Sequence, residues 1–403
     1  MINTHTGPQP ADFTDVRAAN LAVVLRFVRE NAPCSRADIA ASTGLNKATV
    51  SSLVADLVDR RLLRETGLTE NRVGRPATML VLDGSPYAAI GIEVNADHLT
   101  AVAIDLAGTE LLSWRRSFPG ATATPGQAVA AVAALARRVL GRMEKEGRRV
   151  LGIAVAVPGL VDLTGSVRTA PNLGWRDVDL AGDLTRALRH PGFPVLVDND
   201  ANLAVLAEHR FGPHGGAGNV VFLTGGVGVG AGVIMDGRLR RGGRGFAGEI
   251  GHIPVDPGGA ECRCGRRGCL EAVAGVRAVL RDTAPDATPA ELEPELDEVV
   301  RLARAGDPAT IATLTAVGGA LGRGVAVLAN LLNPDVVILG GHYVRLAPWV
   351  LPAARDELAR GSLASEAGGT VLVESTLGYG AAALGAAARL MDAIDSGHLP
   401  AQT

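Results

Sequence analysis

Residues 34–63 read CSRADIAASTGLNKATVSSLVADLVDRRLL and decide the fold of the N-terminal part of this 403-residue chain. Ser35 is a suitable N-cap for a short helix, because Asp38 follows three residues later in a capping-box arrangement and Gly44 ends the helix. Asn46 then caps a second helix, whose apolar stripe is Val50, Leu53, Val54 and Leu57. Two helices separated by a tight glycine-containing turn predict a helix-turn-helix.

The segments on either side extend this motif to a winged helix. An apolar stripe before it, at Leu21, Val24, Leu25 and Val28, predicts one more helix. After it, RLLRETGLTENRVGRPATMLVLD (residues 61–83) predicts two short strands around a tip that carries Arg72 and Arg75. We therefore assign residues 1–82 to a winged helix-turn-helix domain.

The second helix of the motif has a face that suits the major groove of DNA. Its side chains opposite the apolar stripe are small or polar, and arginines at a wing tip suit a narrow minor groove. The candidate DNA contacts are Lys47, Ala48, Thr49, Ser51, Ser52, Arg72 and Arg75. The alternative interpretation is a protein-interaction module of the same shape.

Composition limits the remaining possibilities. The net charge of −3 argues against a general polyanion binder, so any contact with DNA must be local. The first residues contain no basic segment leading into an apolar run, and no uncharged apolar stretch reaches the roughly 18 residues that a membrane span needs. We therefore expect a cytoplasmic protein that does not bind a membrane.

The rest of the chain alternates predicted strands and helices in two strand-rich halves. Ala, Val, Leu and Gly dominate, which is typical of α/β domains with buried strands. This pattern predicts a two-lobed α/β body with a cleft. We place the first lobe at residues 83–200 and the second at 201–377, and we expect a helix at 378–394 to pack back on the first lobe.

Two polar clusters follow predicted strands or loops of this body. DNDAN (residues 198–202) comes directly after the strand PVLV, and GEIGH (residues 248–252) places Glu249 three residues before His252. Carboxylates and amides suit the hydroxyl groups of a sugar, because each can bridge neighbouring hydroxyls without a charge on the ligand. The alternative role for the first cluster is capping of the helix that follows.

The stretch GHIPVDPGGAECRCGRRGCLE (residues 251–271) holds three of the four cysteines. Its glycine content is too high for the segment to hold itself by packing. One imidazole and three thiols, from His252, Cys262, Cys264 and Cys269, predict a four-ligand zinc site, which points to a structural and not a catalytic ion. A redox role or simple burial of the cysteines is the alternative.

Taken in order, PNLGW, DNDAN, GEIGH and CRCGRRGCLE resemble the ROK family, and the resemblance covers about Tyr87 to Met391. The family comprises sugar-responsive repressors and sugar kinases on an actin-like two-lobed fold, and the winged helix resembles the repressor branch. The resemblance implies sugar contacts at Asn172, Asn199, Asp200, Glu249, His252 and Glu271. It also implies that one ring nitrogen of His252 faces the zinc while the other faces the sugar.

Kinases of the family use the equivalent of Asp200 as a general base and bind ATP phosphates with a loop of the form D-x-G-G-T. The matching positions here are Glu93, Asn95, Ala96 and Asp97, whose side chains block the backbone approach and place a carboxylate against a polyanion. The second loop, LTGGVGVGAG (residues 223–232), stays glycine-rich. We therefore expect that sugar binding is kept and phosphoryl transfer is lost.

These observations predict a sugar-sensing repressor that binds operator DNA through its winged helix. Helix-turn-helix proteins gain affinity by reading inverted repeats as two-fold dimers, so we expect a homodimer or a tetramer. The alternatives are an ATP-dependent sugar kinase that carries a DNA-binding domain, and a docking platform for a transport protein.

Overall fold

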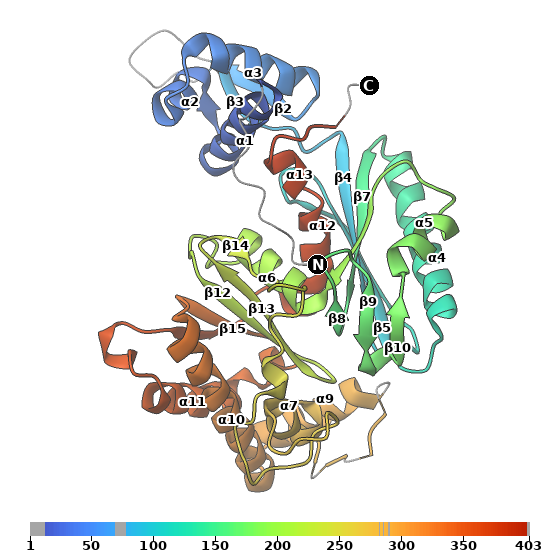
Figure 1. Ribbon diagram of the computed structural model, residues 1–403, viewed down its shortest axis with the longest axis vertical. Coiled ribbons are helices and arrows are strands. Elements are labelled where there is room, and N and C mark those ends of the chain that lie inside the picture. The colour runs from blue at the N-terminus through green and yellow to red at the C-terminus, as the bar shows by residue number, and fades with distance from the viewer. Residues whose placement is uncertain (1–12, 69–77, 282, 285, 289–290, 401–403) are drawn as a thin grey trace, which may run out of the picture.

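The computed structural model describes residues 13–68, 78–281, 283–284, 286–288 and 291–400. Figure 1 shows a small N-terminal domain at one end of a larger body with two lobes. This is the predicted fold class, a winged helix-turn-helix followed by a two-lobed α/β body.

The N-terminal domain has three helices and a three-stranded antiparallel sheet among its described residues. Their bounds are α1 (Phe13–Asn31), β1 (Cys34–Ser35), α2 (Arg36–Thr43), α3 (Lys47–Asp59), β2 (Leu63–Leu68) and β3 (Thr78–Leu82), with sheet order β1-β3-β2. The Ser35 hydroxyl accepts from the Asp38 amide at 3.2 Å, and the Asn46 side chain accepts from the Thr49 amide at 2.8 Å. Both predicted N-caps are therefore confirmed.

The core of this domain extends into the body. The predicted apolar stripes of α1 and α3 are buried against each other, and Tyr87 and Ile394 of the body join the same cluster. The Tyr87 hydroxyl donates to the backbone oxygen of Arg60 at 2.9 Å. The winged helix thus rests directly on the body.

The first lobe is built on a five-stranded sheet in the order β11-β7-β4-β5-β6. Its strands are β4 (Tyr87–Val94), β5 (His98–Ile104), β6 (Glu110–Ser117), β7 (Arg149–Val157) and β11 (Val195–Asn199). Neighbours from β4 to β6 pair antiparallel, whereas β4, β7 and β11 pair parallel. Helices α4 (Pro125–Lys145) and α5 (Leu180–Ala187) cover one face of the sheet.

A small antiparallel sheet projects from this lobe toward the cleft. It contains β8 (Leu160–Val161), β9 (Val167–Ala170) and β10 (Trp175–Val178), with the 3-10 turn η1 (Pro171–Leu173) between the last two strands. Asn172, one of the predicted sugar contacts, lies in this turn.

The second lobe repeats the topology of the first, with sheet order β14-β13-β12-β15-β16. Its strands are β12 (Val220–Gly225), β13 (Val229–Met235), β14 (Arg238–Leu239), β15 (Val336–Gly341) and β16 (Val371–Glu374). One face packs on a layer of helices: α7 (Leu270–Ala274), α8 (Val276–Val279), α9 (Leu292–Arg304), α10 (Pro308–Leu332) and α11 (Tyr343–Gly361). The 3-10 turns named among the described residues of this half are η2 (Ile250–His252), η4 (Ser365–Ala367) and η5 (Gly378–Gly380).

Two helices fill the space between the sheets. Helix α6 (Asp200–Phe211) packs on the second-lobe sheet, and α12 (Ala381–Arg389) packs on the first-lobe sheet, with one shared apolar core. The short α13 (Asp392–Asp395) continues from α12 toward the N-terminal domain (Figure 1). The helix expected at 378–394 is therefore divided into η5, α12 and α13, and our lobe boundaries stay a proposal.

Helix α10 is long and apolar enough to cross a membrane by length and composition, with a mean hydropathy of 1.6. In this structure 56% of the most apolar 18-residue stretch of α10 is buried inside the protein, where α10 packs along α11. Burial in a core explains its apolar composition without a membrane.

Gly385→Ala tests the contact between α6 and α12. A Cβ atom at Gly385 would lie 1.7 Å from the backbone oxygen of Leu203, which cannot move without shifting α6. We expect the substitution to lower the Tm by about 1–4 °C, because overpacking costs about 1–3 kcal/mol. Calorimetry measures the change.

The matched control is Gly141→Ala in α4, where a new Cβ atom would meet nothing within 4 Å. This change is expected to raise the Tm slightly, because alanine favours a helix over glycine. Equal effects of the two substitutions would contradict the close contact.

Candidate functional site

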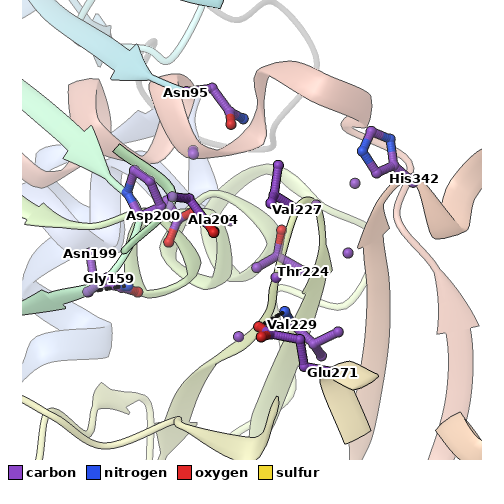
Figure 2. A pocket seen from close by; sticks show the side chains of 18 of the residues that line it. Asn95, Gly159, Asn199, Asp200, Ala204, Thr224, Val227, Val229, Glu271 and His342 are labelled. Carbon is purple, nitrogen blue, oxygen red and sulfur yellow. Dashed lines mark hydrogen bonds between the residues drawn. The ribbon is translucent and has the colours of Figure 1, made fainter. Parts of the chain in front are cut away.

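A cavity of about 640 Å³ lies between the two lobes and takes residues from both. The first lobe contributes the end of β4, the turn η1 and the junction of β11 with α6. The second lobe contributes the loop between β12 and β13, η2 and α7, and the start of α12, which packs on the first-lobe sheet, completes the lining. Figure 2 shows Asp200 and Asn199 at one side of this space, with Glu271 below and His342 at the far side.

Asn199 and Asp200 stand where β11 ends and α6 begins. The Asn199 oxygen accepts from the Asn202 amide at 3.0 Å, and its nitrogen donates to the Gly159 oxygen at 3.0 Å. The capping role considered for this cluster therefore belongs to Asn199. The Ala201 amide donates to the Asp200 side chain at 2.8 Å, and this side chain lines the cavity.

Asp200 is held in an environment that favours its neutral form. Enclosure by the surrounding protein raises the pKa of its carboxyl to about 7, and the negative charge of Glu93 adds to the shift. Glu249, which faces the cavity, makes a smaller contribution of the same sign. The cavity therefore holds carboxyl groups close enough to one another to favour protonation of Asp200.

Glu249, His252, Glu271 and Asn172 line the same cavity. Glu271 accepts from the Val229 amide at 3.1 Å. A Cβ atom at Gly228 would lie 2.5 Å from the Glu271 oxygen and 3.4 Å from the Asn172 nitrogen, so only glycine leaves room for this pair. Desolvation raises the pKa of Glu249, with the charge of Glu271 acting in the same direction and that of His252 opposing it.

The four predicted metal ligands are brought together. One ligand atom from each of His252, Cys262, Cys264 and Cys269 lies within 4.8 Å of all the others, a group that could hold a metal ion. The Cys262 sulfur is 3.7 Å from His252 Nδ1, and the sulfurs of Cys264 and Cys269 are also 3.7 Å apart. All four cysteines of the chain are free thiols.

His252 connects this cluster to the cavity. Its Nδ1 faces Cys262, and the residue also lines the cavity beside Glu249 and Glu271. A metal ion held at this cluster would therefore fix the orientation of a side chain that a ligand in the cavity contacts.

The loop that matches the kinase phosphate loop is filled with side chains. Glu93 is 6% exposed, and one of its oxygens accepts from the Asn95 side chain at 3.3 Å, while the other has no partner among the described residues. Desolvation raises the pKa of Glu93. Ala96 is buried, and Asp97 bonds His98 at 2.6 Å.

Sequence reasoning missed the residues that surround this loop. Arg115 of β6 lies 3.2 Å from His98 Nδ1 and forms an ion pair with Glu293 of α9 at 2.5 Å, which joins the two lobes. His342 lines the same part of the cavity, where burial lowers its pKa to about 4. Of these residues, only His98 could have been found from the sequence, because it directly follows Asp97. Arg115, Glu293 and His342 are far from the loop in the sequence.

The candidate DNA contacts on α3 share one surface. Lys47, Ala48, Ser51 and Ser52 are exposed and Thr49 is half-buried, whereas the opposite stripe of α3 is buried in the domain core. Arg72 and Arg75 lie outside the described residues.

Comparisons with known proteins match both parts of the chain. The ROK family matches residues 89–393, and the MarR family matches residues 22–71. The "Xylose repressor" of Bacillus subtilis (strain 168) is 31% identical over 95% of this chain and 97% of its own length.

Solved structures agree with the observed fold. A ROK family transcriptional regulator described as a homolog of the E. coli MLC protein has a TM-score of 0.80 and 28% identity, covering 95% of this chain and 98% of its own. A ROK family glucokinase from Streptomyces griseus, solved with glucose and AMPPNP, has a TM-score of 0.64 and 30% identity, covering 75% of this chain and 98% of its own. The match over residues 89–393, more than half of the sequence, means that this chain belongs to the ROK family.

Proposed function

We propose that the chain is a sugar-sensing transcriptional repressor, which binds operator DNA through α3 and the wing and takes a neutral monosaccharide in the cavity. The observation that carries the proposal is the combination of a MarR-type winged helix with a cavity that has all the expected sugar contacts. The relative named as a xylose repressor makes xylose the first sugar to test, followed by glucose.

The chemistry of the cavity favours a ligand rich in hydroxyl groups. Asp200, Glu249 and Glu271 accept hydrogen bonds, and the amide of Asn172 both donates and accepts. A hydroxyl donates to a carboxylate without bringing a negative charge near it. A neutral sugar therefore satisfies these groups better than an anionic ligand.

The same charges argue against ATP. Asp97 and the buried Glu93 match the positions of the phosphate loop in kinases of the family. Residues 93–97 contain no glycine, so their side chains would keep the backbone away from a phosphate group. The glycine-rich loop at residues 225–228 and the related glucokinase keep a sugar kinase with a DNA-binding domain as the second candidate.

We propose that the metal ion is structural zinc. Zn–S bonds are about 2.3 Å long, and tetrahedral ligands on such bonds lie near the 3.7 Å that separates Cys264 from Cys269. Four protein ligands leave no open position for chemistry. The ion would clamp the glycine-rich segment and orient His252 toward the sugar.

Operator binding is expected to use a homodimer or tetramer, because two-fold related recognition helices read an inverted repeat. The sugar changes the affinity for DNA only if it binds the two conformations of the protein unequally. Closure of the lobes around a ligand is the conformational difference that we propose.

The first test is a fluorescence-anisotropy titration onto DNA upstream of the protein's own gene at fixed salt, with and without xylose, glucose and their phosphates. We expect specific binding that one neutral sugar shifts. Specific binding that no sugar shifts would favour the docking platform. Sugar-dependent ATP turnover in a parallel assay would favour the kinase.

Lys47→Ala tests the DNA-binding surface in the same assay. We expect weaker binding to all DNA sequences. The slope of the logarithm of the binding constant against the logarithm of the salt concentration should fall in magnitude by about 1, because one phosphate contact is lost. Lys145→Ala is the matched control, because Lys47 and Lys145 are the two lysines of the chain and Lys145 is exposed on α4. An equal effect of the two substitutions would argue against α3 as the recognition helix.

Metal analysis of purified protein tests the zinc proposal. We expect about one zinc per chain in the wild type, and well below one in Cys269→Ser, because one ligand of four is lost. Sugar affinity should fall together with the zinc, since His252 loses its orientation. Cys34→Ala is the control, because Cys34 lies in the N-terminal domain, and it should retain the metal. Zinc well below one per chain in the wild type would contradict the proposal.

Asp200→Asn tests the charge in the cavity through its pH dependence. The pKa of Asp200 is raised from 3.8 to about 7, so the wild type loses stability as the pH rises from about 4 to 7, where the unfolded chain releases this proton and the folded chain keeps it. Asparagine carries no such penalty. We expect Asp200→Asn to raise the Tm by at least about 2 °C at pH 8, by less at pH 5, and to weaken sugar binding.

Asp198→Asn provides the matched control two residues earlier. Asp198 forms an ion pair with Arg241, 3.1 Å from Nε, so its removal leaves Arg241 without this partner and should lower the Tm at pH 8. A gain from Asp200→Asn that is the same at pH 5 and pH 8 would be inconsistent with a raised pKa.

A further inference from the structure

Helices α6 and α12 both run from the cavity toward the N-terminal domain. Helix α6 begins at Asp200 in the cavity, and Arg210 stands near its other end. Helix α12 begins with Ala381 and Ala382, which also line the cavity, and continues through Met391 into α13. Figure 1 shows α12 and α13 passing between the lobes to reach α1.

The two helices belong to different lobes but touch through their backbones. Helix α6 packs on the second-lobe sheet and α12 on the first-lobe sheet. They meet at Gly385, where the Leu203 oxygen leaves no room for a side chain. A change in the angle between the lobes is therefore a movement of α6 relative to α12.

A chain of charges connects the far ends of these helices to α1. Arg210 of α6 pairs with Asp395 of α13 at 2.9 Å, and Asp395 also pairs with Arg29 of α1 at 2.5 Å. These side chains are 18–26% exposed, so solvent screens the pairs only in part. Burial lowers the pKa of Arg210, and the positive charge of Arg29 acts in the same direction. Asp392 of α13 also lies 4.0 Å from Arg210.

The segment after α13 also holds the recognition helix. Arg60, the residue that ends α3, donates to the Pro400 oxygen at 2.7 Å. Gly397 lies against the backbone of Ala18 in α1, where a Cβ atom would come within 2.0 Å of its oxygen. The position of α13 and of the residues that follow it therefore fixes the position of α3.

We propose that the ion triad Arg29–Asp395–Arg210 transmits the state of the cavity to the DNA-binding domain. Arg210 moves with the second lobe, whereas Asp395 follows α12 and the first lobe. When the angle between the lobes changes, Arg210 moves relative to Asp395, and the ion pair between them strengthens or weakens. The ion pair of Asp395 with Arg29 changes in response, and α1 and α3 shift. This coupling rests on the proposed function, and it requires the triad to differ between the two states.

The test is Asp395→Asn in the full-length protein, which keeps the shape of the side chain and removes its charge. Two quantities are measured: sugar affinity by calorimetric titration, and the ratio of operator Kd values with and without sugar by anisotropy. Couplings of this kind are about 5- to 150-fold. We expect the ratio to fall toward 1, by at least about fivefold, while sugar affinity changes by less than about twofold.

Three further variants separate coupling from general damage. Arg29→Gln should reproduce the loss, Arg29→Lys should keep the coupling because it keeps the charge, and the double variant Arg29→Gln with Asp395→Asn should lose no more than either single variant. Arg301→Gln is the matched control, because Arg301 forms an ion pair with Glu298 at 2.6 Å on α9, away from the domain junction, and it should leave the ratio unchanged. If Asp395→Asn does not fold, Arg29→Gln carries the same test.

If both Asp395→Asn and Arg29→Gln bind sugar and keep the wild-type ratio of operator Kd values with and without sugar, the proposed role of the triad is wrong. The proposed repressor function would be unaffected by that result. A wild-type protein whose operator affinity no sugar changes would overturn the proposed function and the coupling together.

Discussion

The backbone contact between α6 and α12 is the constraint on which the rest of the architecture depends. Gly385 lies against the Leu203 oxygen, and Gly91 of β4 lies against the backbone of Ala383 on the other side of α12. Side chains larger than hydrogen at these two positions would push the layers apart. Both helices begin at the cavity, so this contact lies directly behind it.

Negative charge defines what this cavity accepts. Burial raises the pKa of Asp200 and the charges of Glu93 and Glu249 add to the shift, so the protein holds this carboxyl group at a cost in stability. A site built in this way recovers that cost when a ligand donates hydrogen bonds, which sugar hydroxyls do and phosphates do not. A glucokinase and a transcriptional regulator of the ROK family both match this fold, so the fold by itself does not distinguish the two functions.

Local features were predictable because their physics is local. The caps at Ser35 and Asn46 and the stripes of α1 and α3 depend on residues three or four positions apart, and the structure has them where the sequence placed them. The cluster that could hold a metal ion was predictable for the same reason, since three of its four residues lie within eight positions. Asn199 could not be assigned in advance, because a helix cap and a sugar contact use the same amide.

The sequence alone determined the winged helix, the two-lobed α/β body, the metal-ligand set and the motifs that form the cavity. Only the tertiary structure decided how the parts are joined: Arg115 meets Glu293 across the lobes, and Asp395 meets Arg29 and Arg210 at the domain junction. Arginine and acidic residues are frequent over the whole chain, and nothing in their local spacing distinguishes a solvated charge from a paired one. Such pairs form only after the packing of α6 and α12 has brought distant segments together.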